Sequence, residues 1–243
     1  MTHALYRADA YRSQAPATVA AITERGGICL DASLFYPTSG GQTGDGGRLS
    51  WDGGAAEIVL TVKDGEDTVL VPAEGSTLPQ VGTKITQTLD WARRYRCMRL
   101  HTGLHLLSVV IPLPVTGGHI TPEKGRLDFD MPDAPGDKQD IEDQLNALVE
   151  ADAPVAEEWI TDAELDADPG LVKTLSVQPP RGTGRVRLVR IGGEQQIDLQ
   201  PCGGTHVRST AEVGRLRLGK IEKKGRRNRR VSVTLEDPDR PHE

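Results

Sequence analysis

The sequence is poor in cysteine and has no long apolar run. Its 243 residues include three cysteines, Cys29, Cys97 and Cys202, and so odd and sparse a set does not build a disulfide framework. No apolar stretch approaches the roughly 20 residues that a membrane-spanning helix needs. The first residues also lack the apolar segment of a signal peptide. These absences predict a cytoplasmic protein with no membrane contact.

Two common catalytic motifs are also missing. His101 and His105 are four residues apart, but no glutamate follows His101, so the general base of the H-E-x-x-H metalloproteases is absent. The segment 35–47 is rich in glycine, yet it fits neither a Walker A loop nor the G-x-G-x-x-G pattern. Spacing alone favours a tight hairpin between strands for this segment, because glycine tolerates positive φ and close backbone approach.

Charge is distributed unevenly along the chain. The formal net charge of -6 argues against nucleic acid as a partner, and residues 128–168 are acidic with Lys138 as their only lysine or arginine. Residues 215–230 reverse the balance, with nine basic side chains against the single acid Glu222, and a smaller basic cluster lies in 93–99. Local patches rather than net charge bind phosphates, although a solvated charged face is the more common explanation of an arbitrary charge run.

The order of elements predicts an α+β protein. Residues 1–90 form a β-rich, small barrel-like domain, with short strands expected at 18–23, 27–31, 56–62 and 68–71. Residues 91–236 form an α+β domain with a mainly antiparallel sheet, and residues 237–243 form a loose tail. A helix with its apolar residues on one face is expected from about 91 to 110. Pro112 and Pro114 end that helix.

Two short motifs together predict a metal site. On a helix, His101 and His105 lie one above the other on the same face. Cys202 and His206 stand in a glycine-rich turn that lets both side chains fold toward one point. A donor set of three imidazoles and one thiolate suits Zn²⁺ in tetrahedral geometry. Either motif alone is more often structural than metal-binding, whereas the pair is far more specific.

Five segments resemble the editing domain of alanyl-tRNA synthetases and the glycine motif before it, and they occur along this chain in the same order as in that family. Residues 35–42 (FYPTSGGQ) with 45–47 (DGG) resemble the glycine motif, 99–107 (RLHTGLHLL) the first metal motif and 202–207 (CGGTHV) the second. Residues 126–130 (RLDFD) and 223–231 (KKGRRNRRV) resemble further stretches. The likeness extends from about residue 30 to 235, and the length resembles the free-standing AlaX editing proteins of the longer type.

The resemblance implies hydrolysis of the ester between a mischarged amino acid and the acceptor end of tRNA(Ala). Serine is the expected substrate, glycine a second one, and alanine is spared. It implies Zn²⁺ bound by His101, His105, Cys202 and His206, which are also the expected catalytic residues. Thr116 is expected to recognise the serine hydroxyl, and Gln42 to approach the same pocket.

The basic residues expected to hold tRNA phosphates are Arg93, Arg94, Lys223, Lys224, Arg226, Arg227, Arg229 and Arg230.

Several points stay open at the level of sequence. A zinc hydrolase of another aminoacyl-tRNA or aminoacyl ester fits the same residues, as does a non-catalytic tRNA-binding module in which zinc is structural. No side chain stands out as a general base, and no obligate protein partner is evident. Gly103 departs from the family pattern inside the first metal motif, where a missing side chain is expected either to open space beside the pocket or to loosen the helix.

Overall fold

The computed structural model describes residues 2–133, 136–173 and 184–236. The chain divides into two compact units, Met1–Tyr95 and Arg96–Glu243, and the boundary falls within helix α1 (Trp91–Val110). The expected loose tail, 237–243, lies outside the described residues. None of the helices in the described ranges is long and apolar enough to cross a membrane.

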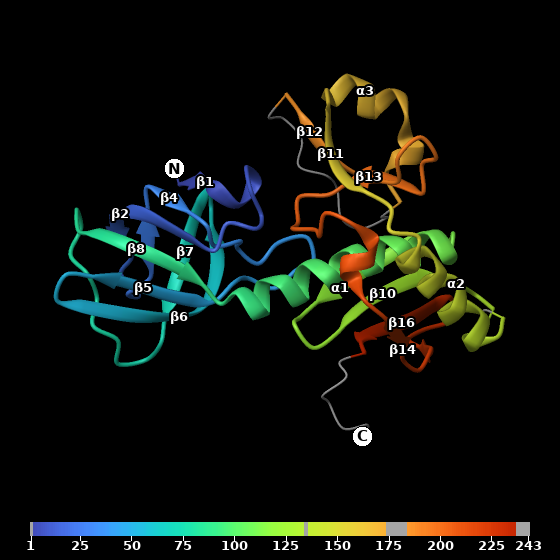
Figure 1. Ribbon diagram of the computed structural model, residues 1–243, viewed down its shortest axis with the longest axis horizontal. Helices are drawn as coiled ribbons and strands as arrows, with labels where there is room; N and C mark the ends of the chain where they lie inside the picture. The colour runs from blue at the N-terminus through green and yellow to red at the C-terminus, as the bar shows by residue number, and fades with distance from the viewer. Residues whose placement is uncertain (1, 134–135, 174–183, 237–243) are drawn as a thin grey trace. The chain divides into compact units, whose positions relative to one another are not determined.

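The first unit is a closed barrel of six antiparallel strands (Figure 1). The strands follow one another around the barrel in the order β2, β3, β7, β6, β5, β8. Their bounds are β2 (Gln14–Ile22), β3 (Ile28–Leu30), β5 (Gly47–Trp51), β6 (Gly54–Asp64), β7 (Asp67–Pro72) and β8 (Lys84–Leu89). Strand β1 (His3–Ala4), which precedes the barrel strands, pairs in parallel with β4 (Ala32–Ser33), which lies between β3 and β5 in the chain. A 3-10 turn, η1 (Leu5–Arg7), follows β1. The α+β class and the barrel are thus confirmed.

Closure of the barrel depends on two strands that the sequence did not predict. Strand β8 pairs with β2 on one side and with β5 on the other. Within β8, Ile85, Gln87 and Leu89 point inward. Gln87 is a fully buried amide, and it satisfies the chain where β4 ends by accepting from the Leu34 N–H (2.8 Å) and donating to the Ala32 carbonyl (3.0 Å).

The glycine-rich segment 35–47 is a long loop from β4 to β5 that is buried except around its tip, where Thr38 and Gly40 are exposed. Its centre is the carboxylate of Asp45, which accepts from the Tyr36 N–H (2.6 Å) and is held by the Arg94 guanidinium (2.5 Å). Gly44 has no room for a side chain, because a Cβ there would stand 2.0 Å from the Thr61 carbonyl oxygen. The segment is therefore a folded loop built around an ion pair, and the expected tight turn lies at its tip, where the main chains of Ser39 and Gln42 exchange two hydrogen bonds (3.1 and 2.9 Å).

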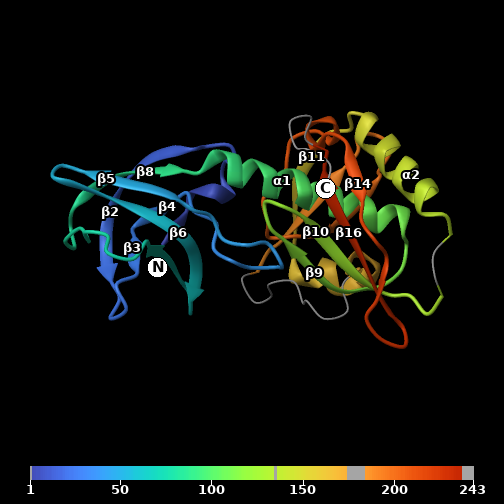
Figure 2. The same cartoon turned by 90° about the horizontal axis from the view of Figure 1, so that it is seen from below.

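In the second unit, α1 accompanies an antiparallel sheet with strand order β14-β16-β10-β9, to which β15 adds on β16 (Figure 2). The strands are β9 (Val115–Ile120), β10 (Gly125–Asp130), β14 (Leu216–Leu218), β15 (Glu222–Lys223) and β16 (Asn228–Leu235). Helix α1 ends at Val110, ahead of the two prolines that were expected to stop it.

Helix α2 (Lys138–Glu150) seals the outer edge of this sheet at β14. The side chain of Asn146 exchanges two hydrogen bonds with the main chain of Leu216, both 2.9 Å long. Glu142 accepts from the Leu218 N–H at 2.7 Å. An exposed edge strand invites pairing with other chains, and these three bonds occupy that edge within the molecule.

A second, three-stranded antiparallel sheet carries the remaining elements (Figure 1). Its order is β11 (Val155–Ile160), β12 (Val186–Ile191), β13 (Asp198–Pro201). One face packs with helix α3 (Asp162–Ala167) and the turn η2 (Pro169–Leu171) around a small core of Leu165, Val186 and Leu188. A last turn, η3 (Thr210–Val213), leads from the end of this sheet to β14.

Candidate metal centre

The two predicted metal motifs meet in the second unit. The ligand atoms of His101, His105, Cys202 and His206 all lie within 4.8 Å of one another. The Cys202 sulfur is 3.3 Å from His101 Nε2 and 3.2 Å from His206 Nε2. Helix α1 presents the first pair from successive turns, and the loop after β13 presents the second. Among the described residues, these four side chains form the one cluster of three or more metal-ligating groups close enough together to hold an ion.

His105 is oriented by a carboxylate that sequence reasoning missed. Asp198 Oδ2 is 2.9 Å from His105 Nδ1, and its other oxygen accepts from the Lys173 ammonium at 2.5 Å. Gln200 donates to the same carboxylate at 2.8 Å. A carboxylate bonded to Nδ1 leaves Nε2 of the neutral ring free for a metal. Asp198 and Gln200 alternate along β13, and Cys202 follows at the next alternate position just after the strand, so their shared side was a signal in the sequence.

His206 and Cys202 are held from behind as well. His206 Nδ1 lies 3.1 Å from the Thr102 hydroxyl, which also accepts from the Val207 N–H at 3.3 Å. The Gly204 N–H donates to the Cys202 sulfur (3.4 Å). Arg187 donates to the main-chain carbonyls of Cys202 (2.7 Å) and Gly204 (2.9 Å). The loop that carries the second pair of donors is therefore fixed in place.

The electrostatics of the cluster favour the metal-binding forms of Cys202 and His206, whereas His105 holds a proton that a metal ion would have to displace. Burial would raise the pKa of the Cys202 thiol, but the neighbouring imidazoles of His101 and His206 outweigh it and hold that pKa well below its usual value. Burial, reinforced by His101, holds the pKa of His206 well below its usual value, which keeps that ring neutral. Burial also disfavours charge on His105, yet its bond to Asp198 prevails and raises its pKa to about 9.

The comparisons with known proteins bear on the whole chain. Residues 186–232, which include Cys202 and His206, match the family "Threonyl and Alanyl tRNA synthetase second additional domain", and residues 7–93 match "tRNA synthetases class II (A)". The alanyl-tRNA editing protein AlaX-M of Methanosarcina barkeri is 33% identical over 98% of this chain and 100% of its own length. The chain belongs to the AlaX-M family of alanyl-tRNA editing proteins.

Other relatives agree with this membership. AlaX-M of Saccharolobus solfataricus is 33% identical over 97% of this chain and 99% of its own length. The alanine–tRNA ligase of Pyrobaculum neutrophilum is 35% identical over 91% of this chain but only 25% of its own length, so the likeness is to one part of a larger enzyme. Membership of the AlaX-M family confirms the prediction of an editing enzyme, a deacylase.

Gly103, where this member of the family departs from the expected motif, does not open space. A Cβ at this position would stand 2.9 Å from the nearest methyl group of Leu216 and 3.6 Å from one of Val213. Both side chains are fully buried. The room beside Gly103 is thus filled by β14 and η3, so the first of the two expected effects is wrong.

The two expected substrate-binding residues lie in different units. Thr116, on β9, is half-buried, and its hydroxyl donates to the Asp128 carbonyl (3.0 Å) and contacts Asn228 Oδ1 (3.3 Å). Gln42 lies in the glycine-rich loop of the first unit, where its side chain is fully buried. A different threonine, Thr102, contacts the metal-binding cluster directly.

Of the two arginines expected to bind tRNA near the start of α1, Arg94 is fully buried. Its guanidinium holds Asp45 and donates to the carbonyls of Leu34 (2.6 Å) and Ala10 (2.8 Å). A guanidinium enclosed in this way cannot reach a phosphate, so we assign Arg94 to the fold. Arg93 is half-buried and donates to the Gly44 carbonyl at 3.0 Å.

The basic residues of 223–230 fall into two groups. The side chains at the turn are exposed, namely Lys223, Lys224, Arg226 and Arg227. Arg229 and Arg230, on β16, are half-buried. Arg230 makes two bonds to the carboxylate of Asp128 (2.7 and 2.9 Å), and Arg229 donates to main-chain carbonyls.

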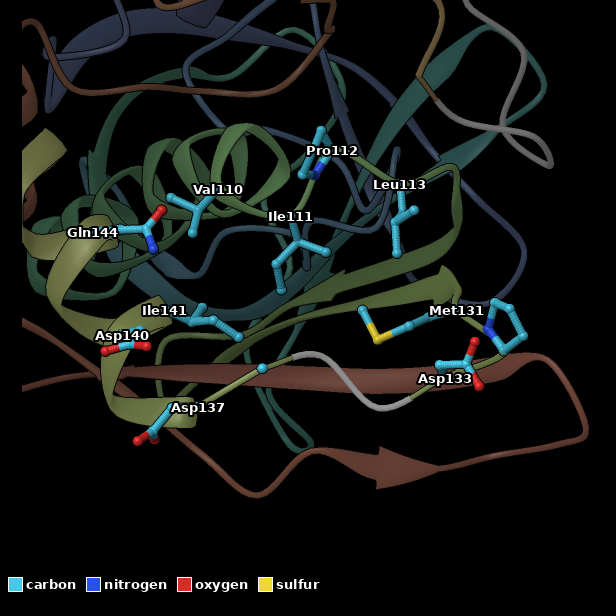
Figure 3. A pocket seen from close by; sticks show the side chains of 12 residues that line it. Val110, Ile111, Pro112, Leu113, Met131, Asp133, Asp137, Asp140, Ile141 and Gln144 are labelled. Carbon is cyan, nitrogen blue, oxygen red and sulfur yellow. The ribbon is translucent and has the colours of Figure 1, made fainter.

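A separate hollow lies between the end of α1 and the start of α2 (Figure 3). Ile111, Met131 and Ile141 form its apolar wall, and Asp137 and Asp140 stand at its edge. None of the four metal-binding residues lines it. The side chain of Asp137 is already used there as the N-cap of α2, accepting from the Gln139 N–H at 2.9 Å.

Proposed function

We propose that this protein hydrolyses mischarged tRNA(Ala) in trans, removing chiefly serine and also glycine and sparing alanine, at a Zn²⁺ ion bound by His101, His105, Cys202 and His206. The observation that carries the proposal is the convergence of these donors, from two segments about 100 positions apart, in a chain that belongs to an editing family. We also propose residues 1–90 as the glycine-motif domain, residues 91–236 as the editing domain, and the cytoplasm as the site of action.

The donor set fits zinc in both chemistry and size. Zinc binds imidazole nitrogen at about 2.0 Å and thiolate sulfur at about 2.3 Å in tetrahedral sites, which places a sulfur and a nitrogen ligand roughly 3.5 Å apart. The two sulfur–nitrogen distances at Cys202, 3.3 and 3.2 Å, are slightly shorter than that spacing, so a small outward shift of the side chains admits the ion. The Asp198 carboxylate behind His105 matches the support that zinc-binding histidines usually have.

The chemistry divides between the ion and the chain. When bound, zinc supplies a Lewis acid that polarises the ester carbonyl or acidifies a water. The chain holds its donors rigid through Asp198, Thr102 and Arg187. We assign Thr116 to recognition of the aminoacyl group, whereas the side chain of Gln42, as fully buried as that of Arg94, is assigned to the fold of its loop.

Recognition of the hydroxyl explains the expected selectivity. A site built to hydrogen-bond a serine hydroxyl rejects alanine strongly, because its own polar groups would be left unpaired. The tRNA itself is held by its phosphates, for which we propose Arg93, Lys223, Lys224, Arg226 and Arg227, with Arg229 and Arg230 bracing the strand.

The test is deacylation of tRNA(Ala) charged separately with serine, glycine and alanine, by the wild type and by Cys202→Ala. We expect fast loss of serine, slower loss of glycine and no loss of alanine, all abolished in a folded Cys202→Ala protein. Equal hydrolysis of free seryl esters would favour a general ester hydrolase.

A second candidate function follows from the closure of the site. Four protein ligands normally make a zinc site structural, so a tRNA-binding module without catalysis is the alternative. Unfolding on zinc removal, together with tRNA binding and no hydrolysis of any of the three substrates, would establish it.

A further inference from the structure

One row of the three-stranded sheet joins the metal centre to an exposed tryptophan. Trp159 on β11 stands opposite Arg187 on β12, and Leu188 stands opposite Pro201 on β13. The Cys202 N–H donates to the Arg187 carbonyl (3.1 Å), which continues the ladder by one residue. Cross-strand partners point to the same face of a sheet. Trp159, Arg187 and Cys202 therefore share one face.

That face is the one turned away from the small core of α3. Leu188 and Val186, the neighbours of Arg187 in β12, are buried with Leu165 on the opposite side. Trp159 is 49% exposed, on the edge strand of the sheet (Figure 1). About half of the Trp159 side chain is thus open to solvent, on the same face of the sheet as Cys202. A solvent-facing position of a strand is more often occupied by a polar side chain.

The spacing along the row is short and braced. Neighbouring strands lie about 4.8 Å apart, so the main chains of Trp159 and Cys202 are about 10 Å apart. Arg187, the middle member, donates to the carbonyls of Cys202 (2.7 Å) and Gly204 (2.9 Å) and pairs with Glu157 of the tryptophan's own strand (2.6 Å). The guanidinium ties strand β11 to the metal-binding loop and fixes the separation of ring and cluster.

A ligand that spans this separation has an ester at one end and a flat ring at the other. In aminoacyl-tRNA, the ester is carried by the ribose of the 3′-terminal adenosine, whose base is unpaired. Unpaired bases are commonly bound by stacking on aromatic side chains, which contributes a factor of about five to 150 in affinity per base.

We propose that Trp159 is the platform on which the 3′-terminal adenine of the tRNA stacks while the aminoacyl ester lies at the metal centre, and that Arg187 sets the distance between them. This inference rests on the proposed function, because it assigns that function's substrate a binding residue. It predicts that Trp159 recognises the end of the tRNA and contributes nothing to binding of a tRNA that lacks it.

The experiment compares uncharged tRNA(Ala) with the same tRNA lacking its terminal adenosine. In a Trp51→Phe/Trp91→Phe background, the full tRNA should quench the fluorescence of Trp159, and the shortened one should not. Trp159→Ala should weaken binding of the full tRNA about tenfold and leave binding of the shortened tRNA unchanged, while Trp159→Phe should restore most of the loss. Val81→Ala, which removes another exposed apolar side chain (62% exposed), is the control and should behave as the wild type.

Equal binding of both tRNAs by the wild type, or an equal loss on both in Trp159→Ala, would overturn the proposal. A change from dimer to monomer in Trp159→Ala, measured by light scattering, would also overturn it in favour of a protein interface. Deacylation of Ser-tRNA(Ala) by the wild type without adenine-dependent quenching would refute the platform alone. Quenching without deacylation of any charged tRNA would refute the proposed function and keep the platform.

Discussion

Asp198 bonds to two basic groups at once, the imidazole of His105 and the ammonium of Lys173. Asp198→Asn keeps the shape of this side chain and removes its charge, so His105 is held less firmly. We expect zinc affinity to fall about 10- to 100-fold, the usual effect of losing such support. Competition with a chromophoric chelator measures it directly.

Asp130→Asn is the matched control for that variant. Asp130 pairs with Arg227 at the exposed end of β10 (2.8 Å), whereas the metal-binding residues lie on α1 and on the loop after β13. Its zinc affinity should equal that of the wild type. If a folded Asp198→Asn protein also binds zinc as tightly as the wild type, the positioning role of Asp198 is refuted.

The close packing around Gly103 limits what this position accepts. Gly103→Ala should change the free energy of unfolding by less than about 1 kcal/mol, because helix propensity improves while one Leu216 methyl group shifts. Gly103→Leu should overpack the contact with Leu216 and Val213 and cost about 1–3 kcal/mol. Urea denaturation measures both.

Gly193→Leu tests whether the cost belongs to the site rather than to leucine. Gly193 is exposed, and an added Cβ would meet no atom closer than 4.0 Å. The urea midpoint of the Gly193→Leu protein should stay near that of the wild type. A Gly103→Leu protein as stable as this control would contradict the packing argument.

The sequence predicted the cluster of His101, His105, Cys202 and His206 because each pair has a spacing with a direct geometric meaning. It did not predict the support of Asp198 by Lys173, which depends on two segments separated by 25 positions. Nor did it predict the burial of Arg94, since a cluster of arginines resembles a surface patch until its partner Asp45 is known.

At the scale of elements, the Asp45–Arg94 pair holds the glycine-rich loop to the start of α1. Both side chains are almost fully buried, at 1% and 0% exposure. Arg94→Leu leaves the Asp45 carboxylate buried without its cation, so we expect a loss of about 3–5 kcal/mol in stability. A chemical denaturation curve followed by tryptophan fluorescence would show it.

Arg48→Leu provides the comparison within the same barrel. Arg48 pairs with Glu57 at 2.6 Å, but both side chains are more than half exposed (58% and 56%). Exposed pairs contribute about 0–1 kcal/mol, so this variant should be nearly as stable as the wild type. Similar losses in the two variants would refute a structural role peculiar to the buried pair.

Strands β5, β8 and β9 escaped prediction for identifiable physical reasons. In β8, Gln87 occupies an inward position where alternation calls for an apolar residue. In β9, two adjacent glycines, Gly117 and Gly118, have no side chains and a low β propensity, so the sequence shows no strand pattern there. Strand β5 begins at Gly47 and has only Leu49 fully buried, so its pattern is too short to stand out.

At the scale of the molecule, the acidic and basic stretches form ion pairs with each other at three places. Carboxylates of the acidic stretch pair with the basic C-terminal stretch at Asp128–Arg230, Asp130–Arg227 and Glu142–Arg217. The exposed turn at Lys223 and Arg226 carries basic side chains beyond these pairs. The expected phosphate contacts are therefore fewer than the count of basic residues implies.

A salt titration of tRNA binding tests the role of this turn. Lys223→Ala/Arg226→Ala should lower the slope of log affinity against log salt by about 0.7–0.9 for each phosphate that the variant no longer neutralises. Arg215→Ala/Arg217→Ala removes two arginines that pair with Glu236, and it should leave the slope unchanged. Identical slopes in all three proteins would rule out the turn as a phosphate-binding surface.

The most direct test of the central claim is the rate of Ser-tRNA(Ala) deacylation as Zn²⁺ is returned to chelator-treated protein. We expect little activity in the stripped protein and a rise that saturates at one zinc per chain, with no recovery in Cys202→Ala. Full activity in stripped, folded protein would contradict the claim that the cluster of His101, His105, Cys202 and His206 is the centre of the reaction.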